Sequence, residues 1–153
     1  MSDRSRRMCR ELAARHASLQ ELLGETRELL DDIAEAEADA SWCQPAMPVD
    51  DVSNRMEQLV NAARHAFDLE EDERCLAALS RSQPELRDRF EQLNSEHAEL
   101  LDLLEELYEL AGSSVRPTST WDDIEMRYLG FQRRLANHRQ GEEELLALAG
   151  WSE

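Results

Sequence analysis

The sequence predicts an all-α protein, folded as an up-down-up-down four-helix bundle. Leu, Ala, Glu and Arg dominate its 153 residues, whereas Gly and Pro number only five and four, a composition that favours helix. Apolar residues recur at helical spacing along four long segments, and short segments containing Pro, Gly or Ser separate them. No segment alternates apolar and polar residues as a strand does. A chain of this length is expected to form one domain, 1–153.

The first two helices are predicted over about residues 3–38 and 49–80. The segment SWCQPAMP (41–48) contains two prolines and is therefore expected to be a loop. The second helix should start directly after Pro48, where Asp50 favours the positive end of the helix dipole. No proline or glycine interrupts the segment that follows until the SRSQP stretch, so we expect one continuous helix.

The third and fourth helices are predicted over about residues 84–111 and 120–149. Pro84 is a good first residue for a helix, and Gly150 suits a C-terminal cap. The segment between them, GSSVRPTS (112–119), has the composition of a loop. Four helices joined by short loops pack most simply with neighbours antiparallel.

The charge of the chain is strongly one-sided. It has 34 acidic and 17 basic residues, which gives a net charge of -17. This argues against nucleic acids and anionic membranes as partners, because both require basic patches, and no apolar run is long enough to span a bilayer. The acidic field would attract cations. The alternative is simply a well-solvated acidic surface.

The cysteines and the N-terminal segment indicate a cytoplasmic protein. Three cysteines, at positions 9, 43 and 75, form no CxxC pair, and an odd number at wide spacing is typical of free thiols in a reducing compartment. The segment MSDRSRRMCREL is charged and has no apolar core, so no signal peptide is visible.

Four histidines, His16, His65, His97 and His138, fall one in each predicted helix. Imidazole binds transition metals at neutral pH, and helical bundles build metal sites from inward side chains on facing helices. Counted from the connecting turns, three of the four come level within about one turn, whereas His16 lies roughly 9 Å from the level of His65. The alternative for each histidine is a hydrogen-bonded core residue.

The helical faces extend this set to carboxylates. His138 and Glu142 share one face of the fourth helix at i and i+4, and Glu70 lies on the apolar face of the second. His65 points roughly 150° away from that face, so a regular helix leaves it near the surface and only a π-bulge would turn it inward. Burying an unpaired carboxylate costs several kcal/mol, which a metal would offset. For Glu142 the alternative partner is an arginine on the same face, Arg127 or Arg134.

At these residues the chain resembles the hemerythrin-like proteins of the HHE cation-binding domain family, over nearly its whole length. The similar segments are RHASLQELL in the first helix, SEHAELLDLLEEL in the third and NHRQGEEELL in the fourth, which contains the HxxxE pattern of the family. The second helix has RHAFDLEEDE where the family typically has HFxLEE. Aligning the two places Ala66 at the ligand position and His65 one residue early.

The resemblance implies a hemerythrin-like bundle that holds a non-haem di-iron centre, with histidines as terminal ligands and carboxylates as bridges. It implies binding of O₂ or another small diatomic, or sensing of oxygen or redox state, rather than substrate turnover. The implied metal ligands are His16, Glu70, His97, His138 and Glu142, with His65 as a sixth candidate. O₂ carriers of the family have two histidines four apart in the third helix, whereas Leu93 and Leu101 flank His97 here.

Several alternatives follow from this smaller set of imidazoles. The site could hold one iron or another transition metal, since mixed imidazole and carboxylate ligation suits Fe, Mn or Zn better than Mg or Ca. The bundle could instead be a metal-free structural or regulatory protein, or a di-iron oxidase or peroxide-consuming enzyme. The sequence does not specify the oligomeric state.

Overall fold

A computed structural model describes residues 3–39, 49–72, 76–112 and 119–150 of the chain. The described residues form helices and no strand, and their bounds are α1 Asp3–Asp39, α2 Val49–Glu71, α3 Leu76–Ser82, the short 3₁₀ helix η1 Pro84–Leu86, α4 Arg87–Gly112 and α5 Ser119–Leu148. The predicted loop 41–48 lies outside the described residues, as do Cys43 and Cys75. Of the predicted loop 112–119, only the two end residues are described, and they belong to α4 and α5.

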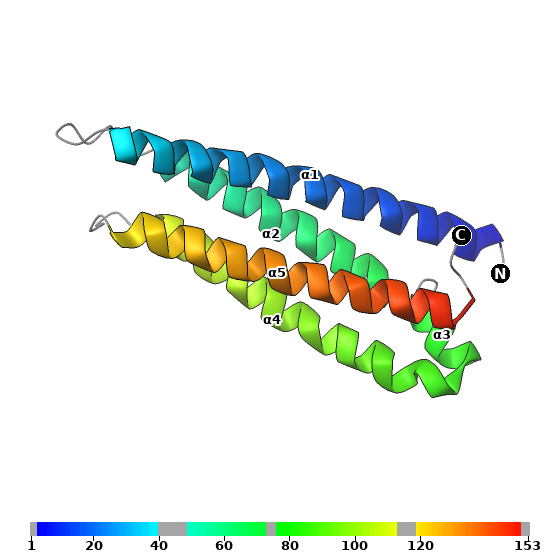
Figure 1. Ribbon diagram of the computed structural model, residues 1–153. Helices are drawn as coiled ribbons and strands as arrows, with labels where there is room; N and C mark the ends of the chain where they lie inside the picture. The colour runs from blue at the N-terminus through cyan, green and yellow to red at the C-terminus, as the bar shows by residue number, and fades with distance from the viewer. Residues whose placement is uncertain (1–2, 40–48, 73–75, 113–118, 151–153) are drawn as a thin grey trace.

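The four long helices lie side by side and alternate in direction, as Figure 1 shows. α1 packs on α2, α2 on α4, and α4 on α5, while α1 and α5 have few contacts with each other. The start of α1 and the end of α5 lie at the same end of the bundle as α3 (Figure 1). The predicted all-α, up-down-up-down fold is therefore confirmed.

The second predicted helix, 49–80, is wrong in one respect, because the chain divides it into α2 and α3. Asp72 is a bend whose amide donates a hydrogen bond to the carbonyl of Leu69 at 3.2 Å, and α3 begins at Leu76. The last turn of α2 contains acidic residues and no basic one, and this opposes the negative end of the helix dipole. The break leaves Leu76 buried, with 2% exposure, against the neighbouring helices.

The end of α5 is closed as the sequence predicts. Gly150 has a positive φ of 74°, a conformation that glycine adopts without strain. Its amide donates to the carbonyl of Ala147 at 3.1 Å, which satisfies a terminal carbonyl of the helix. None of the described helices is long and apolar enough to cross a membrane.

The core consists of two apolar clusters separated by a layer of polar residues. The larger cluster includes Leu19, Phe67, Leu100 and Leu135, and the smaller one includes Leu12, Leu76, Leu93 and Leu145. Along each long helix, polar residues therefore separate the two clusters, and they do so at the same level of the bundle. The residues at that level are His16, Glu70, His97, His138 and Glu142, and we call these five the polar layer.

The ends of α1 and α2 explain why His16 reaches this level. His16 lies about as far before Asp39, the end of α1, as Glu70 lies beyond Val49, the start of α2. The predicted difference in level arose from comparing His16 with His65 of the second helix. Since α2 contributes Glu70 instead, the disagreement disappears.

Candidate metal centre

The polar layer is buried, and it brings together all five of the inward residues that the sequence indicates. Glu70, His97, His138 and Glu142 are 1%, 4%, 2% and 3% exposed. One ligand atom from each of these four lies within 4.8 Å of the others, the geometry of a group that can hold a metal ion. The side chain of His16 is 13% exposed and lies at the edge of this group.

The Glu70 carboxylate spans the layer. Its Oε1 lies 2.7 Å from Nε2 of His16, on α1. Its Oε2 lies 2.5 Å from Nε2 of His97 and 3.5 Å from Nε2 of His138, on α4 and α5. One carboxylate therefore faces imidazoles on two opposite sides with its two oxygens.

The Glu142 carboxylate spans the layer in the same manner. Its Oε2 lies 3.5 Å from Nε2 of His16, and its Oε1 lies 2.6 Å from Nε2 of His138. Nε2 of His138 is also 3.2 Å from Nε2 of His97. The layer thus has one side with a single imidazole and one side with two, and both carboxylates join the two sides.

The chemistry of these donors fits a bound cation. Oε1 of Glu142 is buried and has no hydrogen-bond partner among the described residues, although Nε2 of His138 is only 2.6 Å away. For this pair, a close nitrogen and oxygen that do not satisfy hydrogen-bond geometry are arranged as two ligands of a common centre would be. Mixed imidazole and carboxylate donors suit Fe, Mn or Zn.

A family comparison agrees with this geometry. The family model described as Hemerythrin HHE cation binding domain matches residues 7–149. The chain belongs to this hemerythrin family. Searches of curated proteins and of solved structures gave no match. The polar layer therefore lies within a helical bundle of the hemerythrin, cation-binding type.

The electrostatics of the metal-free hemerythrin-like site depend on protons. Burial disfavours the charged form of His138, but contacts with Glu142, Glu70 and Glu96 outweigh it and raise the pKa of His138 to about 10. Burial, together with the negative charge of Glu70, raises the pKa of Glu142 to about 7. The pKa of Glu70 is held well below its ordinary value by the histidine contacts, although burial opposes this. A proton therefore supplies positive charge within the layer, and a metal ion would displace it.

An aromatic side chain orients the imidazoles. Phe67, one turn before Glu70 on α2, stacks on the His97 ring with centroids 4.2 Å apart and an interplanar angle of 10°. It meets the His138 ring edge-on at 5.7 Å. Phe67 thus fixes the plane of one imidazole and limits the rotation of the other.

His65 is the predicted candidate that the structure does not bring to the layer. It is exposed on α2 and lines a surface pocket together with residues such as Arg15 and Gln58. Ala66, the next residue, is fully buried. No described π-helix rotates this part of α2, because residues 49–71 form a regular α-helix.

The arginine partners that were the alternative for Glu142 are engaged elsewhere. Arg127 lies near Glu106 and Asp123, and Arg134 lies 4.0 Å from Glu99. Neither forms an ion pair with Glu142 in the part of the chain that the structure describes. That alternative is therefore wrong for the described residues.

Two further carboxylates contact the outer nitrogens of the layer, and sequence reasoning missed both. Oε2 of Glu96 lies 2.7 Å from Nδ1 of His138, and Oε1 of Glu71 lies 3.4 Å from Nδ1 of His97. Both acids directly precede or follow a member of the layer in the sequence. Among 34 acidic residues this adjacency was too weak a signal to distinguish them from solvated side chains.

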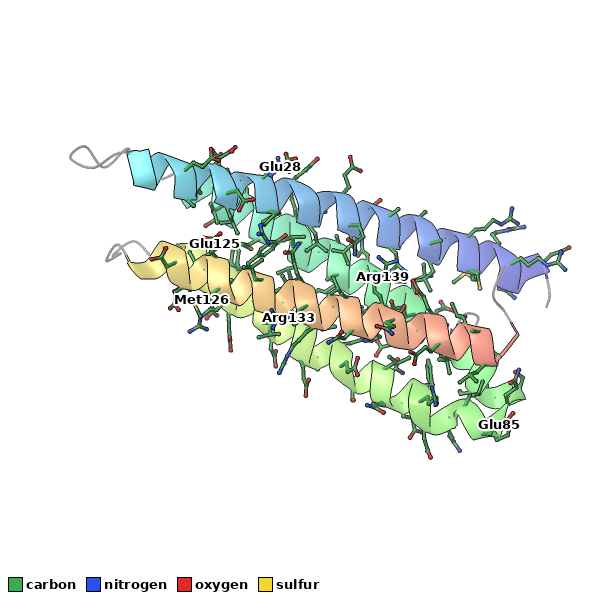
Figure 2. The ribbon with its side chains drawn as sticks, viewed as in Figure 1. Glu28, Glu85, Glu125, Met126, Arg133 and Arg139 are labelled. Carbon is green, nitrogen blue, oxygen red and sulfur yellow. The ribbon has the colours of Figure 1, made fainter. Side chains whose placement is uncertain are left out.

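A cavity of about 110 Å³ is lined mainly by residues of α1 and α5. Its lining residues include His16 and Glu142 of the polar layer, together with Cys9, Ala13 and Arg139. Arg139, labelled in Figure 2, lies on α5 and its Nε is buried without a hydrogen-bond partner among the described residues. Small ions or molecules can therefore approach the His16 side of the layer.

Proposed function

We propose that the polar layer binds two iron ions and that the centre binds O₂ or another small diatomic, or senses oxygen or redox state. The observation that carries this proposal is the pair of carboxylates that each face both sides of the layer. Glu70 directs Oε1 to His16 and Oε2 to His97, and Glu142 directs Oε2 to His16 and Oε1 to His138. A carboxylate between two cations holds them close, because its charge offsets their repulsion.

In this proposal the two ions have unequal ligand sets. His97 and His138 would hold one ion together with an oxygen from each carboxylate. His16 and the other two carboxylate oxygens would hold the second ion. The second ion would therefore have fewer protein ligands, and His16, which would hold it, also lines the cavity between α1 and α5.

The donors narrow the class of metal. Three imidazoles with two carboxylates favour a transition metal over Mg²⁺ or Ca²⁺, and the family is a cation-binding one. Bound iron would supply a redox-active centre. The protein residues would hold it within a dry core, exclude bulk water on the buried side, and keep the His16 side accessible.

A metal-free regulatory bundle is less favoured by the same observations. Two carboxylates that are 1% and 3% exposed sit together, and the pKa of Glu142 is raised to about 7 by burial and by Glu70. Retaining such a pair without a cation costs stability.

The chain's three widely spaced cysteines, without a CxxC pair, favour a reducing cytoplasm as its setting.

One specific observation favours a second candidate, a site for a single ion. Glu70, His97, His138 and Glu142 alone form the compact group, within 4.8 Å, and His16 is not part of it. In that case His16 would be a hydrogen-bonding neighbour of Glu70 rather than a ligand. The number of metal ions per chain distinguishes the two candidates.

The proposal is tested by metal analysis of protein purified without oxygen and reconstituted with Fe²⁺. We expect about two irons per chain and a visible spectrum that appears with O₂ and reverses on its removal. One iron per chain favours the single-ion site, and net consumption of O₂ or peroxide assigns the protein to the enzymes instead. Less than stoichiometric iron, manganese and zinc contradicts the proposal and leaves the metal-free bundle.

A further inference from the structure

Each ring nitrogen of His138 contacts a carboxylate of another described residue. Nε2 lies 2.6 Å from Oε1 of Glu142 and faces the polar layer. Nδ1 lies on the opposite edge of the ring, 2.7 Å from Oε2 of Glu96, which is hydrogen-bond distance. The His138 side chain is only 1% exposed, so Glu96 is its contact on the side away from the layer.

The position of Glu96 follows from helix geometry. It directly precedes His97 on α4, and consecutive residues on a helix point about 100° apart. When His97 points into the core, Glu96 lies on the flank that faces α5. Two neighbouring residues of α4 thus serve the layer differently, since one contributes an imidazole and the other contacts the imidazole of α5.

Glu96 also stands between His138 and solvent. Its side chain is 34% exposed and lines a surface cavity of about 260 Å³ together with Glu99, Arg134 and Asn137. His138 lines the same cavity from its inner side. A charged carboxylate can therefore remain hydrated while one oxygen contacts the buried ring.

The other buried imidazole is held differently. Nδ1 of His97 lies 3.4 Å from Oε1 of Glu71 and has no hydrogen-bond partner among the described residues. The ring is instead stacked on Phe67. On the Nδ1 side, His138 therefore has a hydrogen bond and His97 has none among the described residues.

We propose that Glu96 is a positioning residue, which accepts a hydrogen bond from Nδ1–H of His138 and so keeps the lone pair of Nε2 directed at the metal. This inference rests on the proposed function. A neutral imidazole that binds metal through Nε2 must carry its proton on Nδ1, and a carboxylate at Nδ1 selects that tautomer and makes Nε2 more basic. Without this acceptor, the neutral ring that binds metal would lose the contact that favours a proton on Nδ1.

The test compares Glu96→Ala and Glu96→Gln with a matched control, Glu99→Ala. Glu99 lines the same cavity one turn along α4, is 70% exposed, and is not a contact of His138. Two quantities are measured for each full-length protein. The first is the Nδ1–H resonance of His138 in the metal-free protein by ¹⁵N-edited NMR, and the second is Zn²⁺ affinity by competition with a chelator.

We expect Glu96→Ala to lose the downfield Nδ1–H resonance and to bind Zn²⁺ about 10–100-fold more weakly, the usual cost of removing such an outer contact. Glu96→Gln keeps an amide oxygen as acceptor, so it should retain the resonance, shifted upfield, and most of the affinity. Glu99→Ala should match the unmodified protein in both. Circular dichroism of the metal-free variants shows that each is folded.

Two results overturn the inference. One is an unchanged Nδ1–H resonance in Glu96→Ala, and the other is a Zn²⁺ affinity equal to that of Glu99→Ala. If the unmodified protein binds no metal, the proposed function fails and the positioning role fails with it. In that case the resonance still reports whether the Glu96–His138 hydrogen bond exists, so the two failures are distinguishable.

Discussion

His138 and Glu142 lie one turn apart on the same face of α5, and Nε2 of the first is 2.6 Å from Oε1 of the second. The corresponding positions of α2 are Ala66 and Glu70, both buried. Both α2 and α5 therefore carry a carboxylate in the polar layer, but only α5 has a histidine four residues before it. This difference leaves one side of the polar layer with fewer nitrogen donors than the other.

Removing His138 should abolish metal binding, whereas removing His65 should not. His138 contributes a buried Nε2 to the polar layer, and His65 is exposed on α2. Since the loss of an outer contact costs up to about 100-fold in metal affinity, His138→Ala should exceed that loss. His65→Ala is the matched control, and chelator competition measures both. Equal affinities in the two variants would remove His138 from the ligand set.

The metal-free protein should lose stability as the pH rises from about 6.5 to about 10. The folded-state pKa of His138 is about 10 against an ordinary 6.5, so its contribution is complete below pH 6.5 and is lost on approaching pH 10. The raised pKa of Glu142, about 7, adds a loss in the same direction at lower pH. The lowered pKa of Glu70 has its effect only at acidic pH.

Chemical denaturation with chelator present, at a series of pH values, measures this slope. One titrating proton gives at most about 1.4 kcal/mol per pH unit. The variant His138→Gln should lose most of the slope above pH 7. A stability that is flat or rises between pH 6.5 and 10 in the unmodified protein is inconsistent with a protonated His138 in the layer.

Placing histidine at position 66 should strengthen metal retention. Ala66 and Glu70 share one face of α2 at i and i+4, the spacing of His138 and Glu142 on α5. Because Ala66 is fully buried, Ala66→His should cost the metal-free protein about 1–3 kcal/mol through overpacking. The loaded protein should nevertheless release iron to a chelator more slowly. Faster release in a folded variant would show that this face of α2 does not point at the metal.

Closing the cavity between α1 and α5 should slow the approach of small ligands. Ala13 lines this cavity, and Ala17, exposed one turn further along α1, does not. Ala13→Trp should reduce the rate at which azide binds the iron-loaded protein, measured by stopped flow, with iron content unchanged. Ala17→Trp is the control. Identical rates in the two variants would mean that ligands reach the layer by another route.

Much of this structure could be predicted from the sequence because helical periodicity places side chains on definite faces. The apolar face of α5 predicted that His138 and Glu142 point inward. The apolar face of α2 predicted that Glu70, rather than His65, points into the core. The end of α2 at Glu71 could not be predicted, because no proline or glycine follows it until Pro84. It depends on the acidic C-terminal turn and on the packing of Leu76.

The outer contacts of the site could not be predicted for a different reason. Glu96 lies on the flank of α4, where a solvated acid and a hydrogen-bonding acid have the same sequence pattern. Which of the two it is depends on the distance between α4 and α5, and the sequence pattern of a single helix does not specify that distance.

The central claim is that two ions lie side by side within the polar layer, joined by Glu70 and Glu142. Anomalous diffraction at the iron edge, from crystals of the iron-loaded protein, tests it most directly. We predict two peaks in the layer, one beside His16 and one between His97 and His138, with both carboxylates in contact with each. A single peak, or no peak at this level of the bundle, would contradict the claim.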